Sequence, residues 1–495
     1  MQLPLEIDVL APSLQDQIFK QIRDLIMTGR LVPGVRLPGS RALSEQLGVS
    51  RNTILLVYGA LVAEGYLESR EGAGTYVART QPENSMPADA ELVKSLALLK
   101  PIRLVTPEVY EATGSDVNRD IAYDFALERM DAGAFPQNVW RRLANWRMRS
   151  PKFNLTHLGT PKGLRELRDT LAAYLGATRG IVCSPEQIVI ITGVQQALNV
   201  VARLFVRGET MVAMEAPGCS ATAFLFRAYG AQLLPVPVDQ EGIVTSHLPR
   251  LSSSVAFVTP ARHYPLGYVL SACRRRALLD WAEQTNSHIV ELDFDTEIRY
   301  EGSPPVALFG LDRQARVAYL GSFSSSIGPG LRVGYMVLPS ELVQPAVQAV
   351  SLLDHGFPCS GVPWLEQAVL NDFIQSGAFE THLRKIRRTY MARRDCLVAS
   401  LQRHFGSVQM NPAFCGTHLA WELPTVCPGA PRIQELMFRY KVGVYTLRDP
   451  NIAAAEYFEK CDRYLLLGFA SLAERGIELG ISRLARALIQ LPRAP

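Results

Sequence analysis

Arg332 closes a run of small and hydroxyl-bearing residues that reads Gly321-Ser-Phe-Ser-Ser-Ser-Ile-Gly-Pro-Gly-Leu-Arg332. An arginine guanidinium group suits a bidentate grip on a phosphate. A second anion-binding feature is expected after Thr192, where the sequence should begin a helix whose first N–H groups are free. These residues predict either an anion site or a loop that serves only to pack its domain.

No lysine occurs between Lys162 and Lys385, the span that contains this run. A Schiff base with an aldehyde needs a primary amine, and a serine such as Ser325 cannot supply one. Covalent aldehyde chemistry is therefore not expected. The eight cysteines are scattered, and no spacing joins the histidines into a triad or a ligand set. We expect no metal site and no nucleophilic catalysis.

The first 80 residues predict three helices followed by a hairpin. Apolar residues at helical spacing indicate a first helix over 13–28. Ser40 is expected to cap a second helix that ends at Leu47, and Ser50 a third over 51–64. On the buried side of the third helix we place Ile54, Leu55, Tyr58, Leu61 and Val62. Two short β-prone segments follow over 66–77, so the order is that of a winged helix-turn-helix.

The third helix begins with polar side chains, Ser50-Arg51-Asn52-Thr53, at the end that should enter a DNA major groove. Arginine can bridge a guanine edge or a phosphate, asparagine can pair with adenine, and the hydroxyl groups suit phosphates. Arg36 and Arg41 lie nearby in sequence, with only Glu45 as an acidic neighbour before Arg51. We expect this face to bind double-stranded operator DNA.

This module resembles the DNA-binding domain of the GntR family of bacterial regulators. The residues that carry the resemblance are Gly29 to Arg41, Leu47-Gly-Val-Ser-Arg-Asn-Thr53, Glu64-Gly-Tyr-Leu and the Gly72-Ala-Gly74 turn. The resemblance implies that Arg41, Arg51 and Thr53 touch DNA and that Gly74 lies at the wing tip. The alternative is a small helical domain with solvated charges, which the balance of acidic and basic residues over 1–80 favours.

The composition of the 495-residue chain fits two or three globular domains. The N-terminus lacks the pattern of a signal peptide, and no apolar run approaches a membrane span, so we expect a cytoplasmic protein without membrane contact. The net charge of +4 is too small to indicate nucleic-acid binding by itself. Residues 81–120 are polar and bear prolines, which predicts a linker between domains at 1–80 and 121–495.

Beyond the linker, short apolar runs alternate with helical segments, as in an α/β fold with a mostly parallel sheet. The predicted strands are Val189-Ile-Ile, Met211-Val-Ala-Met, Val255-Ala-Phe-Val, His288-Ile-Val-Glu and Val317-Ala-Tyr-Leu. Residues 121–495 resemble fold type I aminotransferases in the Gly321 loop and in Thr192 to Leu198, Glu215-Ala-Pro-Gly and Thr259 to Gly267. The resemblance implies a smaller C-terminal α+β subdomain. Fused to a GntR-type module, the domain resembles the MocR subgroup, which implies a head-to-tail homodimer and sensing of pyridoxal phosphate (PLP) or an aldimine.

The sequence departs from the family where the cofactor should lie. Ser325 stands at the position of the PLP lysine, Leu292 at that of the aspartate on the pyridine nitrogen, and Phe294 at that of a tyrosine on the ring hydroxyl. Three further departures are Cys219 for a stacking aromatic residue, Leu158 for a phosphate-binding tyrosine and Leu466 for a carboxylate-binding arginine. The residues that still match the family's phosphate site are Gly193, Gln195, Ser324 and Arg332.

These features predict a transcription regulator whose large domain is a pseudoenzyme that dimerises the DNA-binding modules, with or without a small-molecule effector other than PLP. One alternative keeps the regulator and adds PLP bound without a covalent bond through Arg332. The other alternative is an active PLP-dependent aminotransferase, which the absence of a lysine at 325, an aspartate at 292 and an arginine at 466 opposes.

Overall fold

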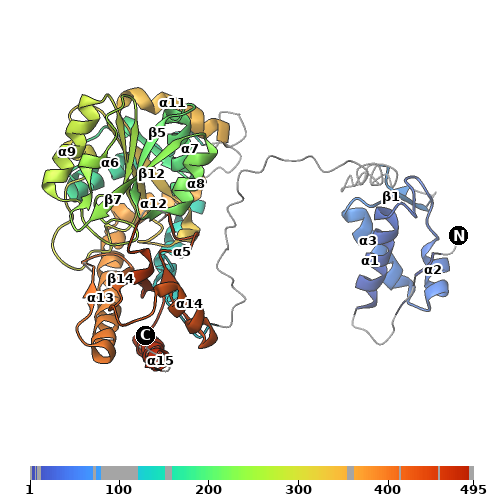
Figure 1. The fold of residues 1–495 in the computed structure, drawn as a ribbon. Coiled ribbons are helices and arrows are strands. Elements are labelled where there is room, and N and C mark those ends of the chain that lie inside the picture. The colour runs from blue at the N-terminus through green and yellow to red at the C-terminus, as the bar shows by residue number, and fades with distance from the viewer. Residues whose placement is uncertain are drawn as a thin grey trace. The chain divides into compact units, whose positions relative to one another are not determined.

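We describe the protein from a computed structural model, which covers residues 3–5, 7, 13–70, 74–79, 121–150, 159–353, 362–411, 414–454 and 458–489 (Figure 1). Contacts divide the chain into two units, residues 1–106 and 107–495. The predicted linker over 81–120 lies outside the described residues, so its bounds stay a prediction.

The N-terminal unit contains the three expected helices and the hairpin. Its elements are α1 (Leu14–Met27), α2 (Ser40–Leu47), α3 (Arg51–Ala63), β1 (Leu67–Arg70) and β2 (Gly74–Val77). The strands β1 and β2 pair antiparallel, with Leu67 opposite Val77 and Arg70 opposite Gly74. Ile18 and Ile22 of α1 and Ile54 and Leu61 of α3 are fully buried in the core of the unit. The prediction of a winged helix-turn-helix is confirmed.

Two details of the predicted helices were wrong. Gly39 precedes α2 as its cap residue, and Ser40 is the first residue of the helix. On α3 the buried residues are Ile54, Val57, Tyr58 and Leu61, whereas Leu55 is 49% exposed and Val62 is 36% exposed. Positions 54, 57, 58 and 61 form one helical stripe, and positions 55 and 62 each lie one residue beyond it.

The large unit is built on a sheet of eight strands whose order is β4-β12-β11-β10-β9-β5-β7-β8. Their bounds are β4 (Ile188–Ile191), β5 (Met211–Ala216), β7 (Gln232–Asp239), β8 (Gly242–Ile243), β9 (Val255–Val258), β10 (His288–Asp293), β11 (Val317–Ser322) and β12 (Gly334–Val337). The strands from β11 through β10, β9 and β5 to β7 are parallel. The remaining pairs are antiparallel. All five predicted strands and the mostly parallel α/β sheet are confirmed.

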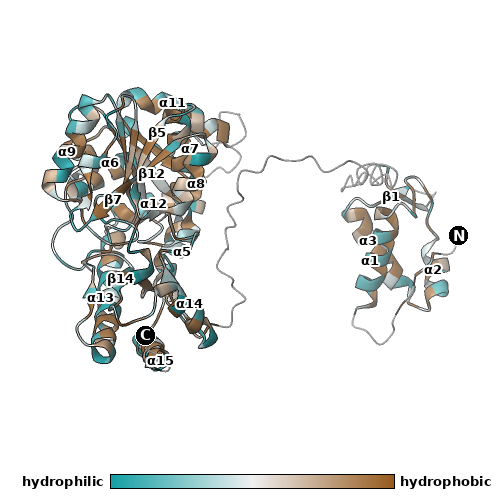
Figure 2. Cartoon of the chain, in the orientation of Figure 1, coloured by the Kyte–Doolittle hydropathy of each residue, from teal (hydrophilic) through white to brown (hydrophobic). Residues whose placement is uncertain are grey.

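Helices cover both faces of this sheet (Figures 1 and 2), which explains why its strands are apolar on both sides. One face packs against α7 (Val194–Phe205), α8 (Ser220–Ala228) and α11 (Ser340–Leu353). The other face packs against α6 (Arg165–Arg179), α9 (Ala272–Gln284), α10 (Leu308–Leu311), α12 (Trp364–Gln375) and α13 (Ala378–Phe405). Helix α5 (Gln137–Met148) contacts α12 and has no buried residue.

The C-terminal part forms a smaller α+β subdomain, as expected. Its antiparallel sheet consists of β13 (Gln409–Met410), β14 (His418–Glu422), β18 (Tyr464–Gly468) and β16 (Tyr445–Thr446), and its helices are α14 (Ala430–Arg439) and α15 (Glu474–Ile489). Two short pairings tie the subdomain to the rest: β15 (Val442–Gly443) with β3 (Tyr123–Asp124), and β17 (Ala453–Ala454) with β6 (Gly218–Cys219).

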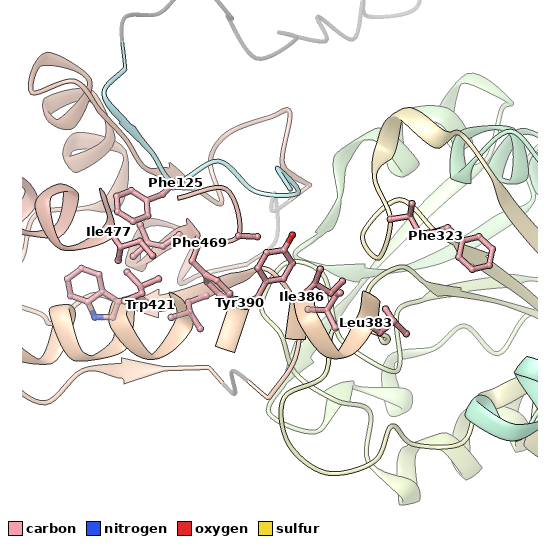
Figure 3. Close-up of a cluster of buried hydrophobic side chains, with 14 of the residues drawn as sticks. Phe125, Phe323, Leu383, Ile386, Tyr390, Trp421, Phe469 and Ile477 are labelled. Atoms are coloured by element: carbon pink, nitrogen blue, oxygen red, sulfur yellow. The ribbon is translucent and has the colours of Figure 1, made fainter. Parts of the chain in front are cut away.

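One apolar cluster joins the subdomain to the large sheet. Figure 3 shows it running along α13, from Phe323 beside β11, past Leu383, Ile386 and Tyr390, to Trp421 of the small sheet. All five side chains are at most 1% exposed. Because Phe323 belongs to the Gly321 loop, this packing fixes the loop against the subdomain.

Candidate functional site

The N-terminus of α3 is held by the side chain of Ser50. The Ser50 Oγ accepts a hydrogen bond from the Thr53 N–H at 3.1 Å and lies 2.8 Å from the Thr53 hydroxyl. This cap fixes the first turn of the helix and leaves Arg51 and Asn52 exposed. Four predicted DNA-binding residues therefore lie together at one helix end, with Ser50 and Thr53 partly committed to each other.

The other predicted DNA-binding residues adjoin this end or the wing. The Arg51 Nε donates to the Ser40 hydroxyl at 3.3 Å, which places α3 beside Arg41 of α2. The backbone of Arg36 forms an isolated antiparallel β-bridge with Tyr76 of the wing. The Arg36 side chain lies close to Gly74, because a Cβ added to Gly74 would be 3.1 Å from the Arg36 Nε.

The three predicted arginines Arg36, Arg41 and Arg51 are exposed and form no ion pair within the described residues. Two other arginines of the unit are neutralised: Arg23 pairs with Asp24, and Arg70 pairs with Glu68. Three of the exposed cations without an ion pair therefore lie at α2, at the start of α3 and beside the wing. The placement of these arginines favours binding of a polyanion such as DNA, although the acidic and basic residues of the unit balance.

The large unit contains a cavity of about 400 Å³ at the carboxyl ends of the strands, next to the start of α7. In open α/β sheets ligands bind at this edge. The five residues predicted to form a degenerate cofactor site all line it: Gly193, Gln195, Ser324, Ser325 and Arg332. The structure thus brings together residues from two distant segments, the start of α7 and the Gly321 loop.

One part of the cavity wall carries groups suited to an anion. Gly193 precedes α7 with a φ of 111°, and the Val194 and Gln195 N–H groups have no carbonyl partner within the helix. The Ser322 hydroxyl donates to the Ser324 hydroxyl at 2.9 Å. Arg332, held with a φ of 54°, is exposed and forms no hydrogen bond or ion pair with the described residues.

Ser325, Leu292 and Phe294 line the cavity, at the positions where the resemblance led us to expect the lysine, aspartate and tyrosine of the cofactor site. Among the described residues no lysine lines it. Asp293, which is next to Leu292 in β10, points to the opposite face and accepts a hydrogen bond from the Tyr319 hydroxyl at 2.8 Å. This orientation follows from the alternation of side chains along a strand.

The other three residues that differ from the family's cofactor site are Cys219, Leu466 and Leu158, and the first two lie in different places. Cys219 lines the cavity, and burial raises the pKa of its thiol. Leu466 is fully buried in the small subdomain opposite Ala420 and Tyr445. Arg463 donates to the Leu423 and Cys427 carbonyl groups and is not available to the cavity. Leu158 lies outside the described residues.

Two carboxylates line the cavity that the sequence did not single out as site residues, Glu128 and Glu215. The Glu215 Oε2 accepts hydrogen bonds from the Thr259 N–H at 3.0 Å and the Thr259 hydroxyl at 2.6 Å, and burial raises the Glu215 pKa to about 7. Glu128 has a φ of 58° and accepts a hydrogen bond from the Tyr264 hydroxyl. Glu128 is an exposed residue by its surface area, yet the protein packed around its carboxyl group, and then the charge of Asp295, raise the pKa of Glu128.

Only a weak sequence signal pointed to either carboxylate. Glu215 stands in one of the motifs that carried the aminotransferase resemblance, but that motif assigns it no role. Glu128 lies in an irregular segment whose left-handed backbone no pattern reveals. Within the described residues no group of three or more His, Cys, Asp or Glu side chains could hold a metal ion. The described part of the chain also contains no helix long and apolar enough to cross a membrane.

The fold and both sites define a class of protein: a helix-turn-helix regulator fused to an aminotransferase-like domain. Residues 14–77 match the family described as "Bacterial regulatory proteins, gntR family", and residues 131–417 match "Aminotransferase class I and II". The chain belongs to the family of helix-turn-helix transcriptional regulators that combine these two domains.

Two relatives and one solved structure show how far the similarity extends. The "Probable rhizopine catabolism regulatory protein MocR" of Rhizobium meliloti is 36% identical over 78% of this chain and 77% of its own length. The "HTH-type pyridoxine biosynthesis transcriptional regulator PdxR" of Corynebacterium glutamicum is 32% identical over 84% of this chain and 85% of its own. The kynurenine aminotransferase structure from Pyrococcus horikoshii superposes with a TM-score of 0.70 and 28% identity, over 83% of this chain and all of that one.

Proposed function

We propose that this transcription regulator acts in the cytoplasm as a pseudoenzyme, with an aminotransferase-like domain that dimerises the DNA-binding units and binds a ligand without catalysis. The observation that supports this most strongly is the cavity wall. Ser325, Leu292 and Phe294 all face the one space that the aminotransferase fold reserves for its cofactor. Three separate functional groups are missing from one site.

The residues present do not fit covalently bound PLP. A hydroxyl group at 325 cannot condense with an aldehyde. The Leu292 side chain cannot pair with a protonated pyridine nitrogen. Of the two carboxylates next to it in β10, Asp293 is fixed on the far side of the strand by Arg179 and Tyr319, and Glu291 accepts hydrogen bonds from the Leu308 and Phe309 N–H groups. We therefore derive no catalytic step through this cofactor.

DNA binding is assigned to the α3 start and the wing, through Arg36, Arg41, Ser50, Arg51, Asn52, Thr53 and Gly74. The support is their common location and the unpaired charge of the arginines. The side chains that could read base edges are Arg51 and Asn52, because both are exposed at the first turn of α3. A double-stranded operator is the proposed partner.

We assign dimerisation to the large unit, in the head-to-tail arrangement that the aminotransferase-like fold implies. The outer side of α5 and the segment before it expose apolar side chains: Trp146 at 60%, Met148 at 45% and Phe135 at 37%. A monomer rarely leaves such residues clustered without a partner. A two-fold dimer would read a paired or repeated operator. Sedimentation of the wild type and of Trp146→Glu measures the fraction of dimer. An unchanged dimer fraction in the variant would show that the outer side of α5 is not the dimer interface.

A second candidate function, PLP as a non-covalent effector, is favoured by the anion-binding part of the cavity. Arg332, Ser324 and the start of α7 at Gly193 could hold its phosphate without any lysine. The aldehyde would then remain free, so the ligand would leave on denaturation.

Mass spectrometry of the full chain with excess PLP separates these readings. A pseudoenzyme with a different ligand retains no PLP under native conditions. Retention under native conditions that is lost on denaturation supports PLP as a non-covalent effector. A stoichiometric adduct that survives borohydride reduction and denaturation would overturn the proposed function. The Ser325→Lys variant is the positive control, since it restores an amine at the same place.

A further inference from the structure

We propose that the cavity binds a small amine with an apolar body, its ammonium group lying against the carboxylate of Glu128. The inference rests on the proposed non-catalytic ligand site and names the chemical class of its ligand. Neither the family match nor the names of the relatives assigns such a ligand to Glu128.

The cavity combines apolar walls with two acidic side chains. Phe257, Leu292 and Phe294 line it together with Glu128 and Glu215. The Tyr264 ring, whose hydroxyl donates to Glu128, meets the Phe294 ring edge-on at 5.8 Å. A carboxylate beside aromatic rings is a favourable place for an organic cation, because ring faces also attract positive charge.

Among the described residues, Arg262 is a cation that acts on Glu128, and Asp295 is an acidic group that acts on it. Arg262 is already committed, because it pairs with Asp295 at 2.8 Å and donates to the His418 carbonyl at 2.9 Å. Asp295 adds a second negative charge nearby. A ligand ammonium group would stabilise the ionised form of Glu128, whose pKa is raised without one.

Glu215 gives an independent indication that the cavity expects a polar partner. Its side chain is 6% exposed, and both bonds from Thr259 go to the same oxygen, Oε2. The other oxygen, Oε1, accepts no hydrogen bond from the part of the chain that the structure describes. This oxygen is not among the fully buried atoms of the described residues that lack a partner, so it is open to the cavity, where a ligand N–H group could donate to it.

The surroundings of Glu128 favour an amine that carries no carboxylate beside its ammonium group, while Arg332 lines another part of the same cavity. Leu466 is buried where a carboxylate-binding arginine was expected, and Glu128 would repel a ligand carboxylate. The polarity of this part of the cavity is thus inverted relative to a site for amino acids. An amine without a carboxyl group fits the charge and the apolar walls.

Titration calorimetry of the full-length protein tests the inference with four amines: benzylamine, phenethylamine, hexylamine and cadaverine. At least one should bind, and phenylalanine and 3-phenylpropionate should bind at least about tenfold more weakly than phenethylamine. Failure of all four amines, or equal binding of the carboxylates, would overturn it. Operator binding and PLP retention are measured separately, so the proposed function can stand if this inference fails.

Two substitutions at Glu128 separate loss of the ligand from loss of the fold. Glu128→Gln should weaken the amine about tenfold or more. Glu128→Gly should abolish amine binding yet melt no lower than the wild type, because glycine adopts a φ of 58° more readily. The matched control is Glu209→Gln, since Glu209 is exposed, lies away from the cavity and has a φ of 56°. Unchanged affinity in both Glu128 variants would overturn the inference.

A different observation supports a second proposal, on the DNA-reading helix. Leu55 is 49% exposed and Leu56 is 52% exposed, and they follow Asn52 by three and four residues on the same side of α3. Every exposed residue of α3 after Asn52 is apolar or glycine. Figure 2 shows α3 as a largely apolar helix. We propose that Leu55 and Leu56 contact thymine methyl groups in the major groove.

The occupant of this apolar surface is inferred from its continuity with Arg51 and Asn52 at the start of α3. The proposal rests on the proposed DNA interface. A helix that enters the groove by its first turn brings its next turn to the adjacent base pairs. The C5 methyl group of thymine is the apolar feature of that groove.

The test uses DNA sequences selected from a random pool by the full-length protein, with each thymine then replaced by uracil. We expect the affinity of the protein for DNA to fall several-fold when uracil replaces thymine at one or two positions. In the Leu55→Ala/Leu56→Ala variant the same replacements should leave the affinity unchanged. Val62→Ala, nearer the far end of α3, is the control. Equal affinity for thymine and uracil DNA would overturn the proposal, as would sensitivity that persists in the variant. Failure to select any sequence would instead contradict the DNA interface itself.

Discussion

The Arg179 Nη2 lies 2.7 Å from the Asp293 Oδ2, and both side chains are almost fully buried. The pair lies on the face of the sheet opposite to Leu292, so it holds Asp293 away from the cavity. Glu291, the other carboxylate next to Leu292, is fully buried and accepts hydrogen bonds from two backbone N–H groups. Asp293 cannot replace the missing acid without breaking this pair. The loss of cofactor chemistry that we propose would therefore rest on the packing of β10 as well as on the identity of residue 325.

Breaking this pair should destabilise the large unit strongly. Arg179→Met would leave Asp293 buried and unpaired, at a cost of about 3–5 kcal/mol. The exposed pair of Arg439 and Glu435, at 3.1 Å, is the control, because Arg439→Met should cost under about 1 kcal/mol. Denaturant unfolding of both variants measures the difference. Equal effects would mean that Arg179 does not stabilise Asp293.

The protonation of Glu215 should make stability depend on pH. Burial raises its pKa from 4.5 to about 7 in the folded protein, so the fold favours the protonated form. Its contribution is fully present below pH 4.5 and is lost as the pH rises through about 7, a change of roughly 3 kcal/mol.

Glu215→Gln removes this titration and keeps an oxygen that can accept both Thr259 bonds. The variant should therefore gain stability over the wild type by a few degrees in Tm between pH 5 and pH 8. Melting curves of both proteins across this range measure the gain. A constant difference between the two proteins would show that Glu215 does not titrate in this window.

Arg51 should carry specific DNA affinity. Arg51→Ala should cut the affinity for the selected DNA by about 1–3 kcal/mol if the side chain reads a base edge. Arg23→Ala is the control, since Arg23 already pairs with Asp24 on α1. Fluorescence anisotropy at fixed salt measures both variants. A similar loss for specific and random DNA would reassign Arg51 to the phosphate backbone.

Gly74 should matter for the position of Arg36. Its φ of 110° strains any other residue, and a Cβ would lie 3.1 Å from the Arg36 Nε. Gly74→Ala should displace the Arg36 side chain and lower DNA affinity, with little change in the melting of the large unit. If the Arg36→Ala variant binds DNA normally, the wing does not act through Arg36.

The sequence predicted the framework well because buried strands and capped helices leave local patterns. The apolar run of β10 and the serine cap of α3 are examples. Asp293 could be placed because side chains alternate along a strand. Leu55 was misplaced because α3 is apolar on both its exposed and its buried side, so periodicity did not distinguish them. Glu128 could not be found, because its place in the cavity depends on a left-handed backbone and on contact with the distant Tyr264.

Peptide mapping after borohydride reduction of the protein with excess PLP tests most directly whether the chain holds this cofactor through a covalent bond. We expect no stoichiometric phosphopyridoxyl-lysine in the wild type and one at position 325 in Ser325→Lys. A stoichiometric adduct on any lysine of the wild type, such as Lys162 or Lys385, would contradict this expectation, because the chain would then hold the cofactor covalently by another route.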